Sequence, residues 1–175
     1  MLVPLLTIVG VISVAFAATP APQATAQPCT AAQYRQFDFW LGDWRVVDPQ
    51  GKPAGTNLVT AEYGGCALQE HWKGVGGDQG SSFNIFNGTA GKWHQTWVDN
   101  SGTLLLLDGE SPNPGVMVLS GMRRTRAGRM VEDRITWTKI DDDHIRQLWD
   151  YTADGGKKWS VVFDGTYIRQ QASSR

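Results

Sequence analysis

The sequence lacks most of the features that would assign it quickly to a class of function. Its 175 residues carry a net charge of −1, and so balanced a chain is not expected to have nucleic acid as its main partner. An apolar run over residues 2–16 is too short to span a bilayer comfortably. No stretch indicates a second domain.

Motifs for nucleophilic catalysis, phosphate binding and metal binding are also missing. Residues 80–82, Gly-Ser-Ser, have neither the Gly-x-Ser-x-Gly spacing nor a following helix. The glycines of residues 74–77 lead into an expected strand, so no helix N-terminus is there to bind an anion. The three histidines, His71, His94 and His144, form no His-x-His or His-x-x-x-His pair, and no Cys-x-x-Cys occurs. The sequence therefore predicts no metal site.

The N-terminus predicts an exported protein. Residues 1–17 combine the apolar run with Ala-Phe-Ala at 15–17, a small-x-small cleavage pattern, and are interpreted as a signal peptide. Because no Lys or Arg precedes the run, an uncleaved anchor stays open as the alternative. Residues 18–29, rich in Pro, Ala and Gln, are predicted to be a flexible tether, and residues 30–170 a single domain. The expected location is periplasmic or secreted, with no membrane span after cleavage.

Cysteine is scarce, with two residues in the whole chain, Cys29 and Cys66. In an exported chain they favour a disulfide, which would tie the N-terminal segment to the early part of the fold. Two unpaired thiols are the alternative, because spacing alone does not establish pairing.

What the sequence does contain is a succession of runs in which apolar and polar residues alternate, separated by turns rich in Gly, Asp, Asn and Pro. This pattern is typical of all-β sandwiches and barrels. We expect a short helix over residues 30–41 and then about ten strands. A meander of short hairpins buries its edges most simply by closing, so the prediction is an antiparallel up-and-down barrel with room inside for a modest ligand. The expected strands lie near 43–48, 56–63, 66–74, 80–87, 92–99, 102–108, 115–124, 129–138, 144–151 and 157–168.

The side-chain parity of residues 134–163 predicts an aromatic inner face. Folding the chain at its two aspartate-containing turns places Trp137 across from Gln147 and Trp149 opposite Trp159. Alternate residues of a strand share a face. All four side chains are therefore expected to point to the same side of the sheet.

An earlier hairpin repeats this combination of tryptophan and glutamine. Trp93, Gln95 and Trp97 share one face, and a tight turn before them would bring Ile85 opposite Trp93 and Phe83 opposite Gln95. Ligand sites are mostly apolar and aromatic with a few placed polar groups, as this inner face would be; the alternative is that the two amides only satisfy the indole N–H groups. The predicted ligand-binding residues are Trp93, Gln95, Trp97, Trp137, Gln147, Trp149 and Trp159.

Residues 37–44, Phe-Asp-Phe-Trp-Leu-Gly-Asp-Trp, resemble the opening F-D-F-W-x-G-x-W of a family of uncharacterised, often exported bacterial proteins. More loosely, the chain is similar to the calycin group: lipocalins, fatty-acid-binding proteins and ten-stranded nitrobindin-like barrels. In lipocalins a short helix and Gly-x-Trp begin the first strand, and the Trp, here Trp44, plugs one barrel end. The resemblance implies a barrel with a cavity, without implying a reaction. Nitrobindin-like barrels carry haem on one histidine, for which His71 would be the candidate if it faced inward.

The sequence favours binding of a small apolar or aromatic molecule over catalysis, without a cofactor. An isomerase or cyclase is one alternative: if Leu68 and Trp72 face inward, so does Glu70, and desolvation would raise its pKa for acid–base work. A cation such as Arg134 could instead pair with that carboxylate. A ligand-free structural or interaction module with a filled interior is the other alternative. The arginines of residues 123–129 are either solvated turn residues or a rim that steers an anionic ligand.

Overall fold

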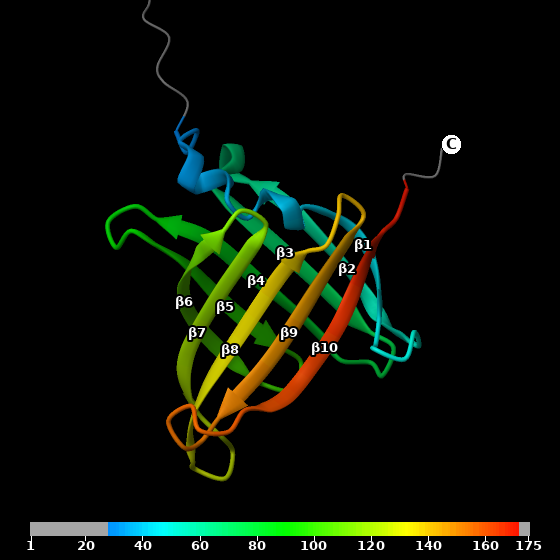
Figure 1. Ribbon diagram of the computed structural model, residues 1–175, viewed down its shortest axis with the longest axis vertical. Helices are drawn as coiled ribbons and strands as arrows, with labels where there is room; N and C mark the ends of the chain where they lie inside the picture. The colour runs from blue at the N-terminus through cyan, green and yellow to red at the C-terminus, as the bar shows by residue number, and fades with distance from the viewer. Residues whose placement is uncertain (1–27, 172–175) are drawn as a thin grey trace, which may run out of the picture.

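The strands of the chain close into one antiparallel barrel (Figure 1). A computed structural model describes residues 28–171. The predicted signal peptide, and the predicted tether up to residue 27, lie outside the described residues. Each strand pairs with the next along the chain, and the last pairs with the first, which confirms the predicted all-β up-and-down barrel. The strands are β1 (Gly42–Val47), β2 (Pro53–Glu62), β3 (Ala67–Gly74), β4 (Gln79–Asn87), β5 (Lys92–Asp99), β6 (Leu104–Asn113), β7 (Val116–Arg124), β8 (Met130–Lys139), β9 (His144–Thr152) and β10 (Ser160–Arg169).

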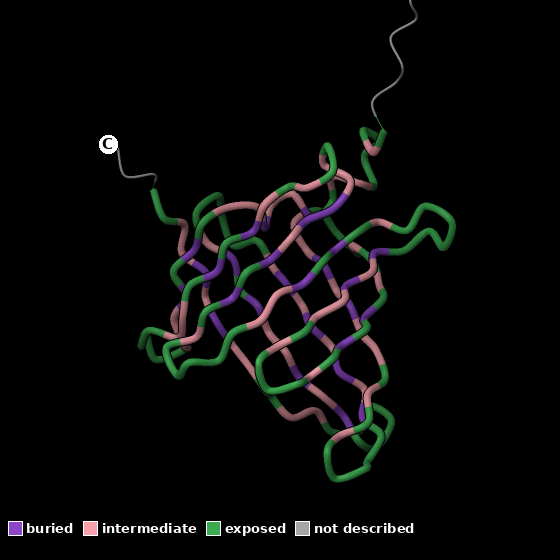
Figure 2. The backbone as a smooth tube through the Cα atoms, turned by 180° about the vertical axis from the view of Figure 1, so that it is seen from behind, coloured by how far each residue is buried: buried purple, intermediate pink, exposed green. Residues whose placement is uncertain are grey.

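Alternation of side chains across each strand builds the core of the barrel. In β8, Val131, Asp133, Ile135 and Trp137 are buried, and the residues between them are partly exposed. Figure 2 shows this alternation as buried and exposed segments that follow one another along the strands. No helix within residues 28–171 is long and apolar enough to cross a membrane.

One end of the barrel is closed by two short helical turns, η1 (Ala32–Arg35) and η2 (Asp38–Trp40), seen above the strands in Figure 1. They replace the single short helix expected over residues 30–41. Phe37, between the turns, stacks on Trp40 with ring centroids 4.9 Å apart. The same ring meets Trp93 at 5.6 Å and Trp137 at 5.1 Å, both edge-on. These four side chains are at most 1% exposed, so this end is filled with aromatic rings, which we call the plug.

Trp44 lies at the start of β1 next to the plug. Its indole N–H donates to the Trp40 carbonyl at 3.0 Å, and the Arg169 guanidinium lies 4.1 Å from the indole centroid. Gly42 permits this arrangement, because its φ is +143° and a Cβ there would lie 2.3 Å from Arg169 Nη1. The start of β1 is therefore fixed by one glycine, one indole and one guanidinium.

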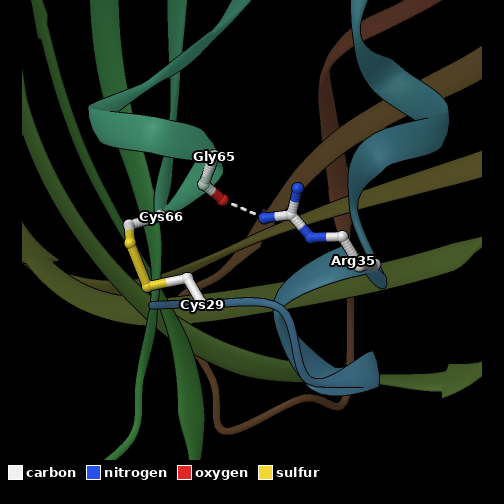
Figure 3. Close-up of a disulfide and its surroundings, with 4 residues drawn as sticks. All are labelled: Cys29, Arg35, Gly65 and Cys66. Atoms are coloured by element: carbon white, nitrogen blue, oxygen red, sulfur yellow. Dashed lines mark hydrogen bonds between the residues drawn. A yellow bond between two sulfur atoms is a disulfide. The ribbon is translucent and has the colours of Figure 1, made fainter. Parts of the chain in front are cut away.

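The predicted disulfide between Cys29 and Cys66 is present (Figure 3). It joins the segment before η1 to the residue after η3 (Tyr63–Gly65), at the start of β3. Arg35 donates a hydrogen bond to the Gly65 carbonyl beside it. The covalent bond and the hydrogen bond together hold the plug segment against the rim of the barrel.

Candidate functional site

A cavity of about 360 Å³ occupies the half of the barrel away from the plug. Its wall is formed by the strand ends opposite η1 and η2, so the plug forms the closed end and the β3–β4, β5–β6 and β9–β10 connections lie near the mouth. The lining residues are Ala54, Glu70, Trp72, Asp78, Gln79, Gln95, Trp97, Asp99, Leu105, Ile135, Gln147, Trp149, Val162, Phe163 and Tyr167.

Aromatic side chains wall the outer part of this cavity. Trp72 in β3 packs edge-on against Phe163 in β10, with ring centroids 5.6 Å apart. Trp97 in β5 and Trp149 in β9 complete the aromatic lining. With the smaller apolar side chains among them, these rings form the apolar surface that a flat or ring-shaped ligand body would contact.

Glycines let two of these rings lie against the barrel wall. A Cβ at Gly80 would lie 2.3 Å from Trp97 Cζ2, and a Cβ at Gly55 would lie 2.6 Å from Trp72 Cη2. Both glycines sit on the strand next to the tryptophan they accommodate. Because even one added methyl group would collide with the indole, these glycines help set the width of the cavity.

Each indole is also held by an aspartate at its N–H. Trp72 donates to Asp78 Oδ2 at 2.6 Å and Trp97 donates to Asp99 Oδ2 at 3.3 Å. These hydrogen bonds fix the N–H edge of each ring at a carboxylate, and both rings and both carboxylates line the cavity. Burial raises the pKa of Asp99, but hydrogen bonds from Ser101 and others outweigh this effect, so its pKa lies below the ordinary value.

The third indole is held by a buried ion pair. Trp149 donates to Asp133 Oδ1 at 2.8 Å, and the same carboxylate receives two hydrogen bonds from Arg123, at 2.7 and 3.0 Å. The Asp133 side chain is fully buried. The positive charge of Arg123 is thus paired with a carboxylate of the protein through two parallel hydrogen bonds, a strong arrangement for a guanidinium.

A network of polar side chains forms the inner end of the cavity around Glu70. The carboxylate accepts hydrogen bonds from Asn57 Nδ2 at 2.8 Å and from Ser82 Oγ at 2.7 Å. Asn84 Nδ2 donates to Ser82 Oγ at 2.9 Å, and Gln95 Nε2 donates to Asn84 Oδ1 at 2.8 Å. The neighbouring strands β2 to β5 contribute these residues in register. The network therefore runs from strand to strand along the inner face of the barrel.

Tyr167 in β10 and Gln147 in β9 extend the network beyond β1, which separates them from β2. The Tyr167 hydroxyl donates to Gln147 Oε1 and receives a 3.4 Å contact from Asn57 Nδ2. Burial, and then the nearby Glu70 carboxylate, raise the pKa of Tyr167 well above its ordinary value. Tyr167 is therefore a neutral hydrogen-bonding group at any physiological pH.

Among residues 28–171, Glu70 has no cationic partner, and it is buried. Its residue is 3% exposed, and both of its hydrogen-bond donors are neutral. Burial raises its pKa to about 7, against the smaller lowering effect of the hydrogen bonds from Ser82 and Asn57. The hypothetical pairing with Arg134 is wrong, because Arg134 lies on the outer face of β8 and binds Asp150 at 2.7 and 3.1 Å.

The sequence-predicted site residues divide into three groups. Gln95, Trp97, Gln147 and Trp149 line the cavity. Trp93 and Trp137 face inward too, but they pack in the plug. Trp159 does neither. It is the last residue of the β9–β10 loop, and the Arg134 guanidinium lies 3.7 Å from its ring centroid on the outer surface.

The predicted pairing of Trp149 with Trp159 is therefore wrong, while Trp137 does lie opposite Gln147 as expected. Trp149 pairs with Phe163, and the register shifts between Val161 and Phe163. A register shift moves side chains to the other face of a sheet. Val161, which alternation along the strand would place on the same face as Trp159, is accordingly 63% exposed, and Phe163 takes the cavity position expected of Trp159.

The expected register of the β4–β5 hairpin is wrong by one residue. Phe86 pairs with Trp93 and Asn84 with Gln95, so Phe83 and Ile85, expected inside, lie on the outer face and are 43% and 40% exposed. The same slip turns Ser82 and Asn84 inward, and sequence reasoning missed both. The loop of residues 88–91 is one residue shorter than the expected pairing implies, because Asn87 still pairs with Lys92, and Gly91 in it has a φ of +67°.

The histidines lie away from the cavity. His71 is exposed on β3 and contacts Ser81 Oγ at 3.2 Å, so it does not take the inward position that the haem alternative requires. His94 contacts Asp108 Oδ1 at 2.8 Å, and His144 contacts an aspartate of its own turn. Within residues 28–171, His, Cys, Asp and Glu side chains form no cluster of three or more that could hold a metal ion.

Comparison with known proteins adds no assignment to this geometry. No protein-family model matches the chain, and no curated protein matches it significantly in sequence. The cavity itself is therefore the basis of the function proposed below.

Proposed function

We propose that the chain is an exported barrel that binds a small molecule in the cavity opposite the plug. The observation that carries the proposal is the combination of a closed end, an aromatic wall and a polar inner end in one space of about 360 Å³. That volume falls within the range of small-molecule sites, and the mixture of many apolar and few polar groups is typical of them.

The aromatic wall favours a ligand with a flat or ring-shaped apolar body. Its rings are held by hydrogen bonds to aspartates and by glycines behind them, so they need little reorganisation on binding. The inner end favours one polar group on that body, placed against Glu70 and Gln95. A module with a filled interior is disfavoured by the size of the cavity.

Export remains part of the proposal. The Cys29–Cys66 bond supports an oxidising compartment, since structural disulfides persist outside the cytosol. Fractionation of cells that express the full chain, with the mass of the recovered protein, would test it. Cleavage after Ala17 is expected, and recovery of the uncleaved chain in the membrane fraction would instead support an anchor.

Ligand binding can be tested by intrinsic tryptophan fluorescence, because three indoles line the cavity. The chain would be titrated with a panel of lipids, flavonoids and haem, and binding confirmed by calorimetry. Trp97→Leu is expected to weaken binding roughly tenfold, as the loss of an aromatic contact would. Trp159→Leu removes an indole outside the cavity and is the matched control. A panel without any binder, or equal losses in both variants, would contradict the proposal.

Acid–base catalysis in the same cavity is the second candidate, and one observation favours it. Glu70 lines the cavity, and its pKa of about 7 suits a group that gives and takes protons near neutral pH. Once a substrate is found, Glu70→Gln should reduce turnover by roughly a hundredfold or more. Full turnover in that variant would remove the catalytic role.

A further inference from the structure

We propose that the ligand of this cavity is an organic cation, with an apolar ring body against the indoles and an ammonium group against Glu70. This inference rests on the proposed function and narrows it to one class of ligand. It adds a charge to the apolar or aromatic molecule expected from the sequence, and that charge is opposite to the one that the arginine-rich hairpin suggested.

The sign of the charges that face the cavity favours a cationic ligand. Among residues 28–171, its lining includes three carboxylates, Glu70, Asp78 and Asp99, and no lysine, arginine or histidine. Arg123, which faces inward nearby, is paired with Asp133. An anionic ligand would meet only like charges here and would lose its hydration without compensation. A cationic ligand would meet complementary charge from the mouth to the inner end.

The inner end of the cavity has more hydrogen-bond acceptors than donors, which also favours a ligand that carries N–H donors. Among residues 28–171, Glu70 receives hydrogen bonds only from neutral groups, and Gln95 Oε1 is buried without a hydrogen-bond partner. The Tyr167 proton is already donated to Gln147. Buried acceptors need donors, and a buried carboxylate needs an opposite charge. A protonated amine supplies up to three N–H donors and that charge in one group.

The aromatic wall favours a cationic ligand as well. Cations bind to the faces of aromatic rings, most strongly to indole. Trp72 and Trp97 donate their N–H groups to carboxylates, which draws electron density toward the rings and favours a cation over their faces. The wall and the carboxylates therefore select the same ligand charge.

The ionisation of Glu70 makes the binding of such a cation depend on pH. The side chains that face its carboxylate are Asn57 from β2, Ser82 from β4, and Tyr167 from β10, with Gln95 from β5 linked through Ser82. Of these only Tyr167 titrates, and its pKa is too high to matter. Since the pKa of Glu70 is about 7, cation affinity should rise with pH until the carboxylate is fully ionised and then level off.

The test uses three probes that share a phenyl ring and a short chain and differ in charge. They are phenethylamine (cationic), phenethyl alcohol (neutral) and hydrocinnamate (anionic), titrated into the full mature chain by calorimetry at about pH 8, above the pKa of Glu70. The cation is expected to bind roughly ten- to a hundredfold more tightly than the alcohol, the usual gain from a charge-assisted hydrogen bond. The anion should bind most weakly.

Glu70→Gln should remove this preference, bringing the cation within about threefold of the alcohol, because the shape is kept and the charge is lost. Glu110→Gln is the matched control. It makes the same chemical change at an exposed position of β6 and should leave the preference intact. If Glu70→Gln does not fold, the wild-type chain still decides: affinity for the cation should rise roughly tenfold or more between about pH 5 and about pH 8, while affinity for the alcohol stays flat.

The outcomes separate the two proposals. An alcohol that binds as tightly as the amine, or an anion that binds more tightly, would overturn the cation assignment and leave the binding function standing. A cation affinity that is independent of pH, or a preference retained in Glu70→Gln, would also overturn the assignment. Failure of all three probes, together with failure of the lipid, flavonoid and haem panel, would overturn both.

Discussion

Glu70 should make the barrel less stable as the pH rises through the neutral range. In an unfolded chain its carboxyl would titrate near 4.5, whereas in the barrel its pKa is about 7, mainly because burial disfavours the charged form. Between these values the folded chain holds a proton that the unfolded chain has lost. The stabilisation of the folded state by this proton is therefore complete below about pH 4.5 and is lost as the pH rises through about 7.

The size of the effect follows from the two pKa values. Each unit of difference between them corresponds to about 1.4 kcal/mol, so ionisation of Glu70 should lower the free energy of unfolding by about 3 kcal/mol. Glu70→Gln keeps the shape of the protonated side chain and cannot ionise. The variant should match the wild type to within about 1 kcal/mol at acid pH and exceed its stability by about 3 kcal/mol at about pH 8.

Urea unfolding of both proteins across this pH range, followed by circular dichroism with the disulfide intact, would measure the difference. Taking the difference between the two proteins cancels the other groups that titrate in both. Glu110→Gln, exposed on β6, should show no such pH-dependent difference. Parallel curves for wild type and Glu70→Gln would refute the reasoning, because they would mean that Glu70 titrates alike in the folded and unfolded states.

Three further predictions concern the framework of the cavity. Replacing Cys29 and Cys66 by serine opens a loop with a sequence separation of 37 and should cost about 4 kcal/mol of unfolding free energy; an unchanged urea midpoint would contradict this. Arg123→Met leaves the Asp133 carboxylate buried and unpaired and should cost about 3–5 kcal/mol, measured by thermal unfolding; a loss below about 1 kcal/mol would mean water replaces the guanidinium. Trp40→Ala empties part of the plug and should cost about 3–5 kcal/mol, with the calorimetric affinity of any cavity ligand less affected than in Trp97→Leu.

The sequence predicted the strands because the signals for a strand and its turns lie in residues that are close together in the chain. Period-2 alternation and Gly- or Asp-rich turns located all ten strands, nine of them to within three residues at each end, while β6 extends five residues beyond its expected end. A meander of hairpins has few ways to bury its edges, so closure into a barrel followed. The inward position of Gln147 opposite Trp137 was also readable, because the aspartate turn between β8 and β9 is short and sets one register.

The predicted register was wrong where the length of a loop differs from the length that its sequence suggests: the β9–β10 loop is longer and the β4–β5 loop is one residue shorter. Asp154 accepts hydrogen bonds from Thr152 Oγ1 and from the Lys158 N–H, and these bonds shape the long β9–β10 loop that leaves Trp159 outside. In the β4–β5 loop, Asn87 Oδ1 similarly accepts the N–H groups of the residues that follow it. Because side chains alternate with a period of two, one loop residue more or fewer reverses every face assignment of the strand beyond it.

The sequence alone thus determined that the chain forms a closed barrel lined with indoles and amides, since alternation and turn chemistry act between near neighbours. Only the tertiary structure decided which of those indoles fill the plug and which surround the cavity, and that Glu70 meets Asn57 and Ser82 instead of a cation. Those contacts join residues on different strands, and their charge balance depends on which side chains the closed barrel brings together. The closed barrel therefore decides the sign of the charge in the cavity. The class of ligand that we infer depends on that sign.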